Sequence, residues 1–217
     1  HNVEAHFVGH PLLDAISDLR EIDSTQFKKD HHLTDKDIIA LLPGSREQEV
    51  TKMLELMLSV RPAFKDYQFV IAGAPSLPKE FYQQYVDENV HFVSNKTYDL
   101  LRCSKAALVT SGTATLETAL LNIPEVVCYR SSTISYEIGK RVVKNIKYIS
   151  LVNIIMDREI VTELIQSGLN TQNLVKELRS ILKGDRREQM LQDFELLREK
   201  LGGKGASDLA ADLIVKG

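Results

Sequence analysis

Short apolar runs rich in β-branched residues alternate along much of the chain with segments whose apolar residues recur at helical spacing. The runs predict buried strands, and the segments between them predict amphipathic helices. The predicted strands are Ile38–Leu42, Tyr67–Ala72, Val90–Val93, Ala106–Thr110 and Val126–Tyr129, and the predicted helices are Arg46–Lys65, Pro78–Glu88, Thr97–Cys103, Thr113–Leu121 and Ile134–Lys144. This alternation predicts an α/β fold with a Rossmann-like, doubly wound parallel sheet.

The pattern becomes mostly helical after Ser150. Apolar residues recur there at helical spacing, and glycines separate the segments. The predicted helices are Arg158–Ser167, Thr171–Leu182, Arg186–Leu201 and Ser207–Val215. The glycine-rich break at 202–205 would allow the last helix to swing onto another surface.

A glycine turn follows the first predicted strand, in the sequence Pro43-Gly44-Ser45-Arg46. A strand that ends in such a turn and leads into a helix points backbone N–H groups at one spot, where the helix dipole also favours an anion. Arg46 adds a planar guanidinium suited to two oxygens of a diphosphate. Ser45 and Gln48 have the spacing of a capping box, which predicts the helix start. An ordinary turn with a solvated arginine is the alternative.

A second glycine turn follows the strand 106–110, in the sequence TSGTATLE at 110–117. Amides and the hydroxyls of Ser111 and Thr113 are expected to hold a phosphate or a sugar. Glu117 lies about one helical turn further on, where its carboxylate could accept hydrogen bonds from two vicinal ribose hydroxyls. A glutamate that only complements the helix dipole is the alternative. Together the two turns predict one pocket for a diphosphate joined to a ribose.

Composition narrows the class of protein. The 217 residues include 43% hydrophobic and 26% charged residues, as is typical of soluble globular proteins, and the formal net charge of -3 argues against a nucleic-acid binder. No apolar run approaches the roughly 18 residues that cross a bilayer, and no leader sequence is evident. Cys103 and Cys128 lack paired spacing, which predicts free thiols in a reducing compartment such as the cytoplasm.

No histidine stands at a spacing typical of a metal site. His31, His32 and His91 lack a nearby carboxylate or cysteine at ligand spacing, and His10 is expected to satisfy backbone groups. The basic stretch Lys140–Lys147 is expected to be either a solvated helix face or a surface that faces an anionic membrane or a phosphate.

An ordered set of short motifs covers nearly the whole chain. They are FVGHPL at 7–12, LLPGSR at 41–46, SGTATLE at 111–117, PEVVCY at 124–129, SLVN at 150–153, RE at 158–159 and EL at 163–164. In the order of these motifs the chain resembles the carboxyl-terminal half of the lipid-A-disaccharide synthases, glycosyltransferases of the GT-B type (family 19). The chain departs from the family at Val152, where many relatives carry proline, and at Met156-Asp157, which replaces a small pair.

The resemblance implies inverting transfer of 2,3-diacylglucosamine from UDP-2,3-diacylglucosamine to the 6-hydroxyl of 2,3-diacylglucosamine 1-phosphate, with release of UDP. It implies no metal and no cofactor. This chain would be the donor-binding half, and the main catalytic base would lie in the amino-terminal half. Position by position, the resemblance assigns catalytic roles to Arg46 and Asn153, and donor binding to Gly44, Ser45, Arg46, Ser111, Gly112, Thr113 and Glu117.

The resemblance also implies three parts. Residues 1–37 would be the interdomain connection, residues 38–167 the donor-binding domain, and residues 168–217 a helical segment that packs on that domain or on the amino-terminal half. Because the chain opens at His1 without a methionine, we expect a piece of a longer protein that binds UDP weakly and is inactive alone. The acylated substrates imply peripheral contact with the inner face of the bacterial inner membrane, and pairing into a homodimer is left open.

Two other interpretations stay open from the sequence. Another GT-B enzyme of UDP-sugars, such as an N-acetylglucosaminyltransferase or a UDP-sugar 2-epimerase, would share the nucleotide pocket. A non-catalytic nucleotide-binding module of doubly wound topology would share only the fold. Selective binding of uridine nucleotides separates the enzymes from the module.

Overall fold

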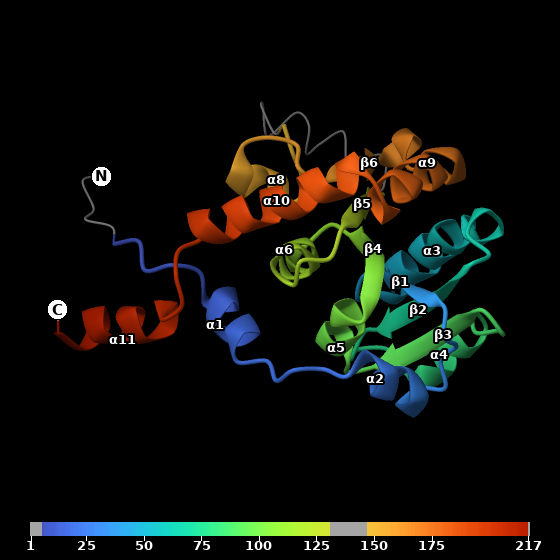
Figure 1. The fold of residues 1–217 in the computed structure, drawn as a ribbon, viewed down its shortest axis with the longest axis horizontal. Coiled ribbons are helices and arrows are strands. Elements are labelled where there is room, and N and C mark those ends of the chain that lie inside the picture. The colour runs from blue at the N-terminus through green and yellow to red at the C-terminus, as the bar shows by residue number, and fades with distance from the viewer. Residues whose placement is uncertain (1–5, 131–146, 217) are drawn as a thin grey trace.

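A six-stranded parallel sheet forms the centre of the computed structural model, which describes residues 6–130 and 147–216 (Figure 1). The strands are β1 Asp37–Leu42, β2 Tyr67–Gly73, β3 Val90–Ser94, β4 Ser104–Thr110, β5 Glu125–Tyr129 and β6 Thr162–Ile165. Their order is β3-β2-β1-β4-β5-β6, and each pairing in it is parallel. This is the order of a doubly wound sheet, so the predicted α/β fold is confirmed.

Helices connect the strands, as parallel pairing requires. Within the sheet region they are α3 Glu47–Leu58, α4 Lys79–Gln83, α5 Thr97–Arg102 and α6 Thr113–Leu120, with a 3₁₀ turn at Arg61–Ala63. Helix α8 Leu151–Met156 lies between β5 and β6. Before β1 lie α1 Pro11–Ser17 and α2 Ser24–Asp30, and after β6 lie a 3₁₀ turn at Gln166–Gly168 and the helices α9 Thr171–Leu182, α10 Asp185–Lys200 and α11 Ala206–Lys216. No helix among residues 6–130 and 147–216 is both long and apolar enough to cross a membrane.

The core lies on both faces of the sheet. Ile39 and Leu41 of β1 pack into a cluster with α3, α9 and α10, whereas Ile38, Ala40 and Leu42 pack into a second cluster with α2 and α5. A strand covered on both faces has no polar side, which explains why β1 is a continuous apolar run. The burial holds the carboxyl end of β1 rigidly in place.

The predicted helix Arg158–Ser167 is wrong, because this segment contains strand β6. Its apolar residues fit a helical period, but β6 pairs with β5 in the register Val126↔Thr162. Asn153 fixes the entry to the strand, since its Oδ1 accepts from the amides of Ile160 and Val161 at 2.8 and 3.1 Å. Pairing with a distant strand therefore overrode the local pattern.

The predicted capping box is also wrong. Helix α3 begins at Glu47 with Arg46 at the N-cap, and no side chain caps it, while the Ser45 carbonyl accepts a hydrogen bond from Ser76 Oγ at 2.7 Å. The helices predicted at 46–65 and 78–88 are shorter in the structure. The predicted helix Ile134–Lys144 and most of the basic stretch Lys140–Lys147 lie outside the described residues.

The first and last helices lie together beside the sheet (Figure 1). The Asp14 carboxylate accepts from the amides of Gly205 and Ser207 at 2.6 and 2.9 Å, and these hydrogen bonds lower the pKa of Asp14. Lys204 adds an ion pair with Asp18 at 2.9 Å. The glycine-rich segment before α11 is thus fastened to α1.

Candidate functional site

The two glycine turns meet at one cavity, as predicted. Strands β1 and β4 are neighbours at the point where the order of the strands in the sheet reverses, which is where doubly wound proteins bind ligands. We call the hollow outside their carboxyl ends the carboxyl-edge cavity; its volume is about 410 Å³. Its lining includes Gly44, Ser45, Glu49, Gly73, Pro75, Thr97, Thr110, Ser111, Gly112, Thr113 and Glu117.

The first turn carries acidic groups as well as amides. Gly44 has a φ of +105°, and an added Cβ there would lie 2.5 Å from Glu49 Oε2. Glu47 and Glu49 occupy the first turn of α3, where they complement the helix dipole. Arg46 is exposed and is not part of the cavity lining. This turn supplies shape, but its own carboxylates oppose a bound anion.

The second turn is the better place for an anion. Gly112 has a φ of +153°, a conformation that side chains disfavour, and it leads directly into α6. The first turn of α6 contains no acidic residue. Ser111 lines the cavity, with its Oγ donating to the Ile149 carbonyl at 3.1 Å, and Thr113 is exposed at the helix start. The amides of α6 are therefore open to a negatively charged group.

Glu117 faces the cavity from α6 and is held by a neighbour. Tyr98 of α5 donates a hydrogen bond from its hydroxyl to Glu117 Oε1 at 2.9 Å. Burial and the Glu117 carboxylate raise the pKa of Tyr98 to about 12, so the phenol keeps its proton at neutral pH. Tyr98 thereby fixes the rotamer of the carboxylate and leaves its other oxygen for a ligand.

Asn153 does not reach the cavity. It is fully buried, and its Nδ2 donates to the Val161 carbonyl at 2.8 Å and to Glu163 Oε1 at 2.9 Å. With the two amides that its Oδ1 accepts, all four of its hydrogen bonds are used within the protein. The catalytic contact expected for Asn153 is therefore not seen.

Asn153 instead belongs to a network that leads to the second turn. Glu163 accepts from the amides of Ile149 and Ser150, both at 2.9 Å, and from Asn153. The Ile149 carbonyl in turn accepts from Ser111. Asn153 and Glu163 thus hold the segment against which the cavity residue Ser111 rests.

His10 caps a helix, and its Nδ1 accepts from the Leu12 amide at 3.2 Å. Within residues 6–130 and 147–216, no group of three or more His, Cys, Asp or Glu side chains is arranged to hold a metal ion. Cys103 and Cys128 are free thiols.

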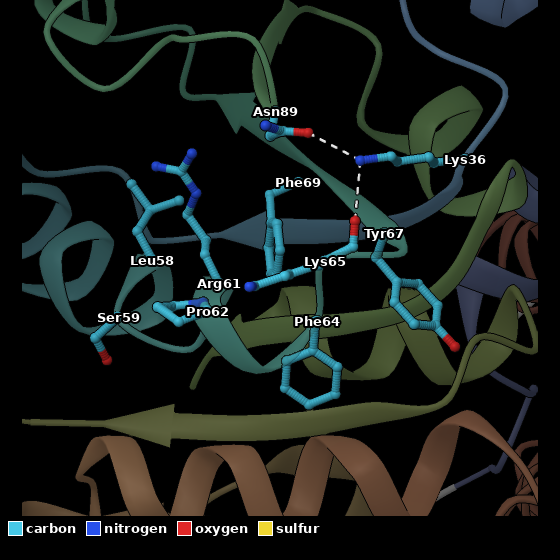
Figure 2. A pocket seen from close by; sticks show the side chains of 10 residues that line it. All are labelled: Lys36, Leu58, Ser59, Arg61, Pro62, Phe64, Lys65, Tyr67, Phe69 and Asn89. Atoms are coloured by element: carbon cyan, nitrogen blue, oxygen red, sulfur yellow. Dashed lines mark hydrogen bonds between the residues drawn. The ribbon is translucent and has the colours of Figure 1, made fainter.

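A second hollow lies at the opposite edge of the sheet, at the start of β2 (Figure 2). We call it the amino-edge hollow; its volume is about 620 Å³, and its lining includes Lys36, Arg61, Phe64, Lys65, Tyr67 and Asn89. Lys36 Nζ donates to the Lys65 carbonyl at 2.9 Å and to Asn89 Oδ1 at 3.0 Å. The concentration of cations and aromatic rings gives it the composition of an anion site.

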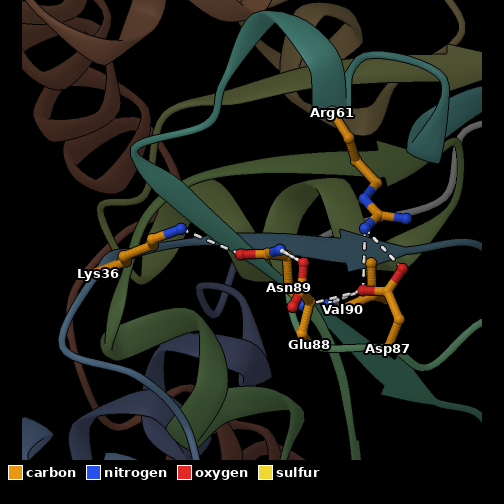
Figure 3. A network of polar contacts seen from close by, with 6 residues as sticks. All are labelled: Lys36, Arg61, Asp87, Glu88, Asn89 and Val90. Atoms are coloured by element: carbon orange, nitrogen blue, oxygen red, sulfur yellow. Dashed lines mark hydrogen bonds and ion pairs between the residues drawn. The ribbon is translucent and has the colours of Figure 1, made fainter.

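The polar groups of the amino-edge hollow are bound to one another (Figure 3). Arg61 Nη2 lies 2.9 and 2.6 Å from the two carboxylate oxygens of Asp87. Asp87 Oδ1 also accepts from the amides of Asn89 and Val90. These contacts tie the starts of β1, β2 and β3 together, and they engage the charged ends of Lys36 and Arg61 within the protein.

Three residues of the carboxyl-edge region were missed in the sequence. Tyr98 carries no local signal, because its role depends on the approach of α5 to α6. Thr110 ends a predicted strand, but its burial against the cavity emerges only in the fold. Glu163 falls in the predicted helix Arg158–Ser167, and a helix there does not predict its contacts to residues 149 and 150.

Solved structures with low sequence identity share this fold. S. aureus MnaA, in a structure with UDP, aligns with a TM-score of 0.59 at 18% identity, over 95% of this chain and 53% of that one. A putative UDP-N-acetylglucosamine 2-epimerase from Listeria monocytogenes aligns with a TM-score of 0.61 at 15% identity, over 95% and 51%. The fold class is that of the GT-B glycosyltransferases and related epimerases.

Sequence comparison gives the family. The family model for lipid-A-disaccharide synthetase matches residues 1–215. The lipid-A-disaccharide synthase of Syntrophus aciditrophicus is 37% identical over 218 residues, which cover 96% of this chain and 56% of that protein. The chain belongs to the lipid-A-disaccharide synthetase family, and it spans about half the length of the curated relatives it matches.

Proposed function

We propose that the carboxyl-edge cavity binds the UDP part of a UDP-sugar. The single observation that carries this proposal is the convergence of Gly44, Gly112 and Glu117 on one cavity at the switch point of the sheet. The diphosphate rests on the amides of α6, and the free oxygen of Glu117 accepts from the ribose hydroxyls.

The whole protein, in this proposal, makes the lipid A disaccharide. The 6-hydroxyl of 2,3-diacylglucosamine 1-phosphate attacks C1 of the donor sugar, and its proton passes to a base outside this chain. The bond from C1 to the β-phosphate oxygen breaks, and its electron pair leaves with UDP. Membership in the family supports this reaction, and the carboxyl-edge cavity supplies a place for the departing nucleotide.

Arg46 stabilises the negative charge that grows on UDP. Its guanidinium is exposed at the N-cap of α3, next to Ser45 of the cavity lining, so a rotation of the side chain brings it over the diphosphate. A cation that engages as charge develops lowers the barrier more than it tightens ground-state binding. Arg46→Ala in the whole enzyme is therefore expected to lower kcat more than it raises KM.

Asn153 acts as a positioning residue. It supports Glu163, and Glu163 holds the segment 149–150 against Ser111. Asn153→Asp keeps the shape but replaces Nδ2, which donates to both Val161 and Glu163, by an acceptor oxygen, so it is expected to disorder this segment. The KM for the donor separates a positioning role from a catalytic contact. If Asn153 positions the site, KM for the donor rises in Asn153→Asp while kcat falls.

Calorimetry of the 217-residue chain with UDP, ADP and GDP tests nucleotide binding. The proposal predicts binding selective for UDP that is weakened by Glu117→Ala. Binding of no nucleotide would contradict it and would favour a non-catalytic module. The full-length enzyme with UDP-2,3-diacylglucosamine and the acceptor then tests the reaction: disaccharide supports the transferase, whereas UDP-sugar interconversion without acceptor supports an epimerase.

Peripheral membrane contact is a further part of the proposal, since both substrates carry acyl chains. Flotation of the full-length protein with vesicles that contain or lack anionic lipid measures it. Replacement of the basic residues of the stretch Lys140–Lys147 by glutamine is expected to weaken binding to anionic vesicles. Unchanged binding would assign the contact to another surface.

A further inference from the structure

Thr110 lines the carboxyl-edge cavity and carries a buried hydroxyl without a hydrogen-bond partner. It is the last residue of β4, it is 5% exposed, and it lines the cavity directly before the turn at Gly112. Its Oγ1 is buried and has no hydrogen-bond partner among the described residues. A hydroxyl of this kind costs stability unless something else satisfies it.

Three hydroxyls close to Thr110 in the chain are satisfied within the protein. Ser111 Oγ donates to the Ile149 carbonyl, Thr115 Oγ1 to the Gly112 carbonyl at 2.8 Å, and Thr118 Oγ1 to the Ala114 carbonyl at 2.7 Å. The other buried side-chain atoms that lack a partner in residues 6–130 and 147–216 belong to His91, Glu125 and Arg198, and none of these lines the cavity. The orphaned group at this cavity is therefore specific to Thr110.

The surroundings of Thr110 indicate the partner that is absent. Thr110 lies three residues before the first residue of α6, Thr113, which lines the same cavity, and the first turn of α6 has no acidic residue. Amides and a hydroxyl at a helix start whose first turn carries no acidic residue suit a phosphate oxygen. Buried polar groups left unsatisfied by the fold are characteristic of functional sites.

We propose that Thr110 Oγ1 donates a hydrogen bond to a phosphoryl oxygen of the nucleoside diphosphate that rests on α6. This inference rests on the proposed function, because it requires UDP in the carboxyl-edge cavity. Thr110 is then a ligand-binding residue whose cost to the empty protein is offset when the diphosphate binds.

The test compares Thr110→Val with two controls in the 217-residue chain. Valine keeps the shape of threonine and removes the hydroxyl, so the affinity for UDP measured by calorimetry is expected to fall about tenfold, the effect of one hydrogen bond to a charged group. Thermal unfolding of the ligand-free variant is expected at the same temperature or higher. Thr110→Ser is expected to keep the affinity for UDP.

Thr118→Val is the matched control, because Thr118 is a buried threonine whose hydroxyl is already bonded within α6. It is expected to lower stability and to leave the affinity for UDP unchanged. Unchanged UDP affinity in Thr110→Val would overturn the inference while the proposed function stands. Lower stability of Thr110→Val without rescue by serine would show a structural role and overturn it too. Failure of the unaltered chain to bind UDP would remove the proposed function as well.

Discussion

The two hollows at opposite edges of the sheet differ in how their polar groups are satisfied. The amino-edge hollow is larger, at about 620 Å³, and it carries the cations Lys36 and Arg61. Both are bound by the protein itself, Lys36 to the carbonyl of Lys65 and Arg61 to the carboxylate of Asp87. The carboxyl-edge cavity is smaller, at about 410 Å³, but it contains an unsatisfied hydroxyl and the open amides of α6.

The difference shows that volume and positive charge do not by themselves identify a ligand site. A cation that already has its carboxylate gains little from a bound anion, because the existing pair must first be broken. Backbone amides at a helix start have no competing partner within the helix. This difference favours the smaller cavity as the candidate ligand site.

Gly112→Ala is expected to have the largest effect on the carboxyl-edge cavity. A side chain at a φ of +153° strains the backbone by about 2 kcal/mol, and relief of this strain moves the amides at the start of α6. We expect the affinity for UDP to fall at least about thirtyfold, measured by calorimetry. Gly168→Ala, at an open position with ordinary φ, is the control and is expected to change neither affinity nor stability.

Replacement of Glu125 tests whether a buried group without a hydrogen-bond partner affects UDP binding when it lies outside the cavity lining. Its carboxylate is completely buried and has no partner among the described residues, and burial, followed by Glu163, raises its pKa well above the usual value. Above the unfolded pKa of 4.5 the unfolded chain loses this proton while the folded chain keeps it, so stability falls as pH rises.

Glu125→Met is expected to stabilise the chain at neutral pH by about 2 kcal/mol, the typical cost of a buried unsatisfied polar group. The gain should shrink as the pH is lowered towards 4.5. Urea unfolding at several pH values measures both. The affinity for UDP is expected to stay the same, since Glu125 does not line the carboxyl-edge cavity. A loss of UDP binding in Glu125→Met would contradict the distinction between unsatisfied groups inside and outside the cavity lining.

Tyr98→Phe removes one hydroxyl and keeps the ring, so it isolates the support of Glu117. Loss of the 2.9 Å hydrogen bond frees the carboxylate, and we expect the affinity for UDP to fall about fivefold, or about 1 kcal/mol. The affinity for 2′-deoxy-UDP should change less, because one of the two ribose hydroxyls is already absent. Equal losses with both nucleotides would argue against a role through the ribose.

Arg61→Met is expected to have the smallest effect, and only on stability. The ion pair with Asp87 is partly exposed, so its loss should cost about 0.5 kcal/mol in urea unfolding. The affinity for UDP is expected to be unchanged. A clear loss of UDP affinity in Arg61→Met would indicate that the nucleotide binds in the amino-edge hollow and not in the carboxyl-edge cavity.

The sequence was sufficient to predict the first five strands and both glycine turns. Residues 38–42 are apolar because β1 is buried on both faces, and a short run rich in β-branched residues is typical of such a strand. Positions such as Gly44 and Gly112 mark turns that side chains disfavour, so their meaning is local. A turn of this kind can therefore be predicted from its own residues, without knowledge of the rest of the fold.

Features that depend on packing between distant segments could not be predicted. Strand β6 exists through pairing with β5, although its apolar residues fit a helix. The burial of Asn153 depends on Glu163 and on the entry to β6, so the resemblance gave its position but not the direction of its side chain. The hydroxyl of Thr110 became informative only when its lack of a partner was visible.

Titration of the ¹⁵N-labelled 217-residue chain with UDP, followed by amide NMR, tests the central claim directly. UDP at the carboxyl-edge cavity should shift the amide signals of Gly44, Ser111, Gly112 and Thr113, and leave those of Tyr67 and Asn89 in place. Shifts confined to Tyr67, Asn89 and their neighbours, or no shift at residues 111–113 at saturating UDP, would contradict the account.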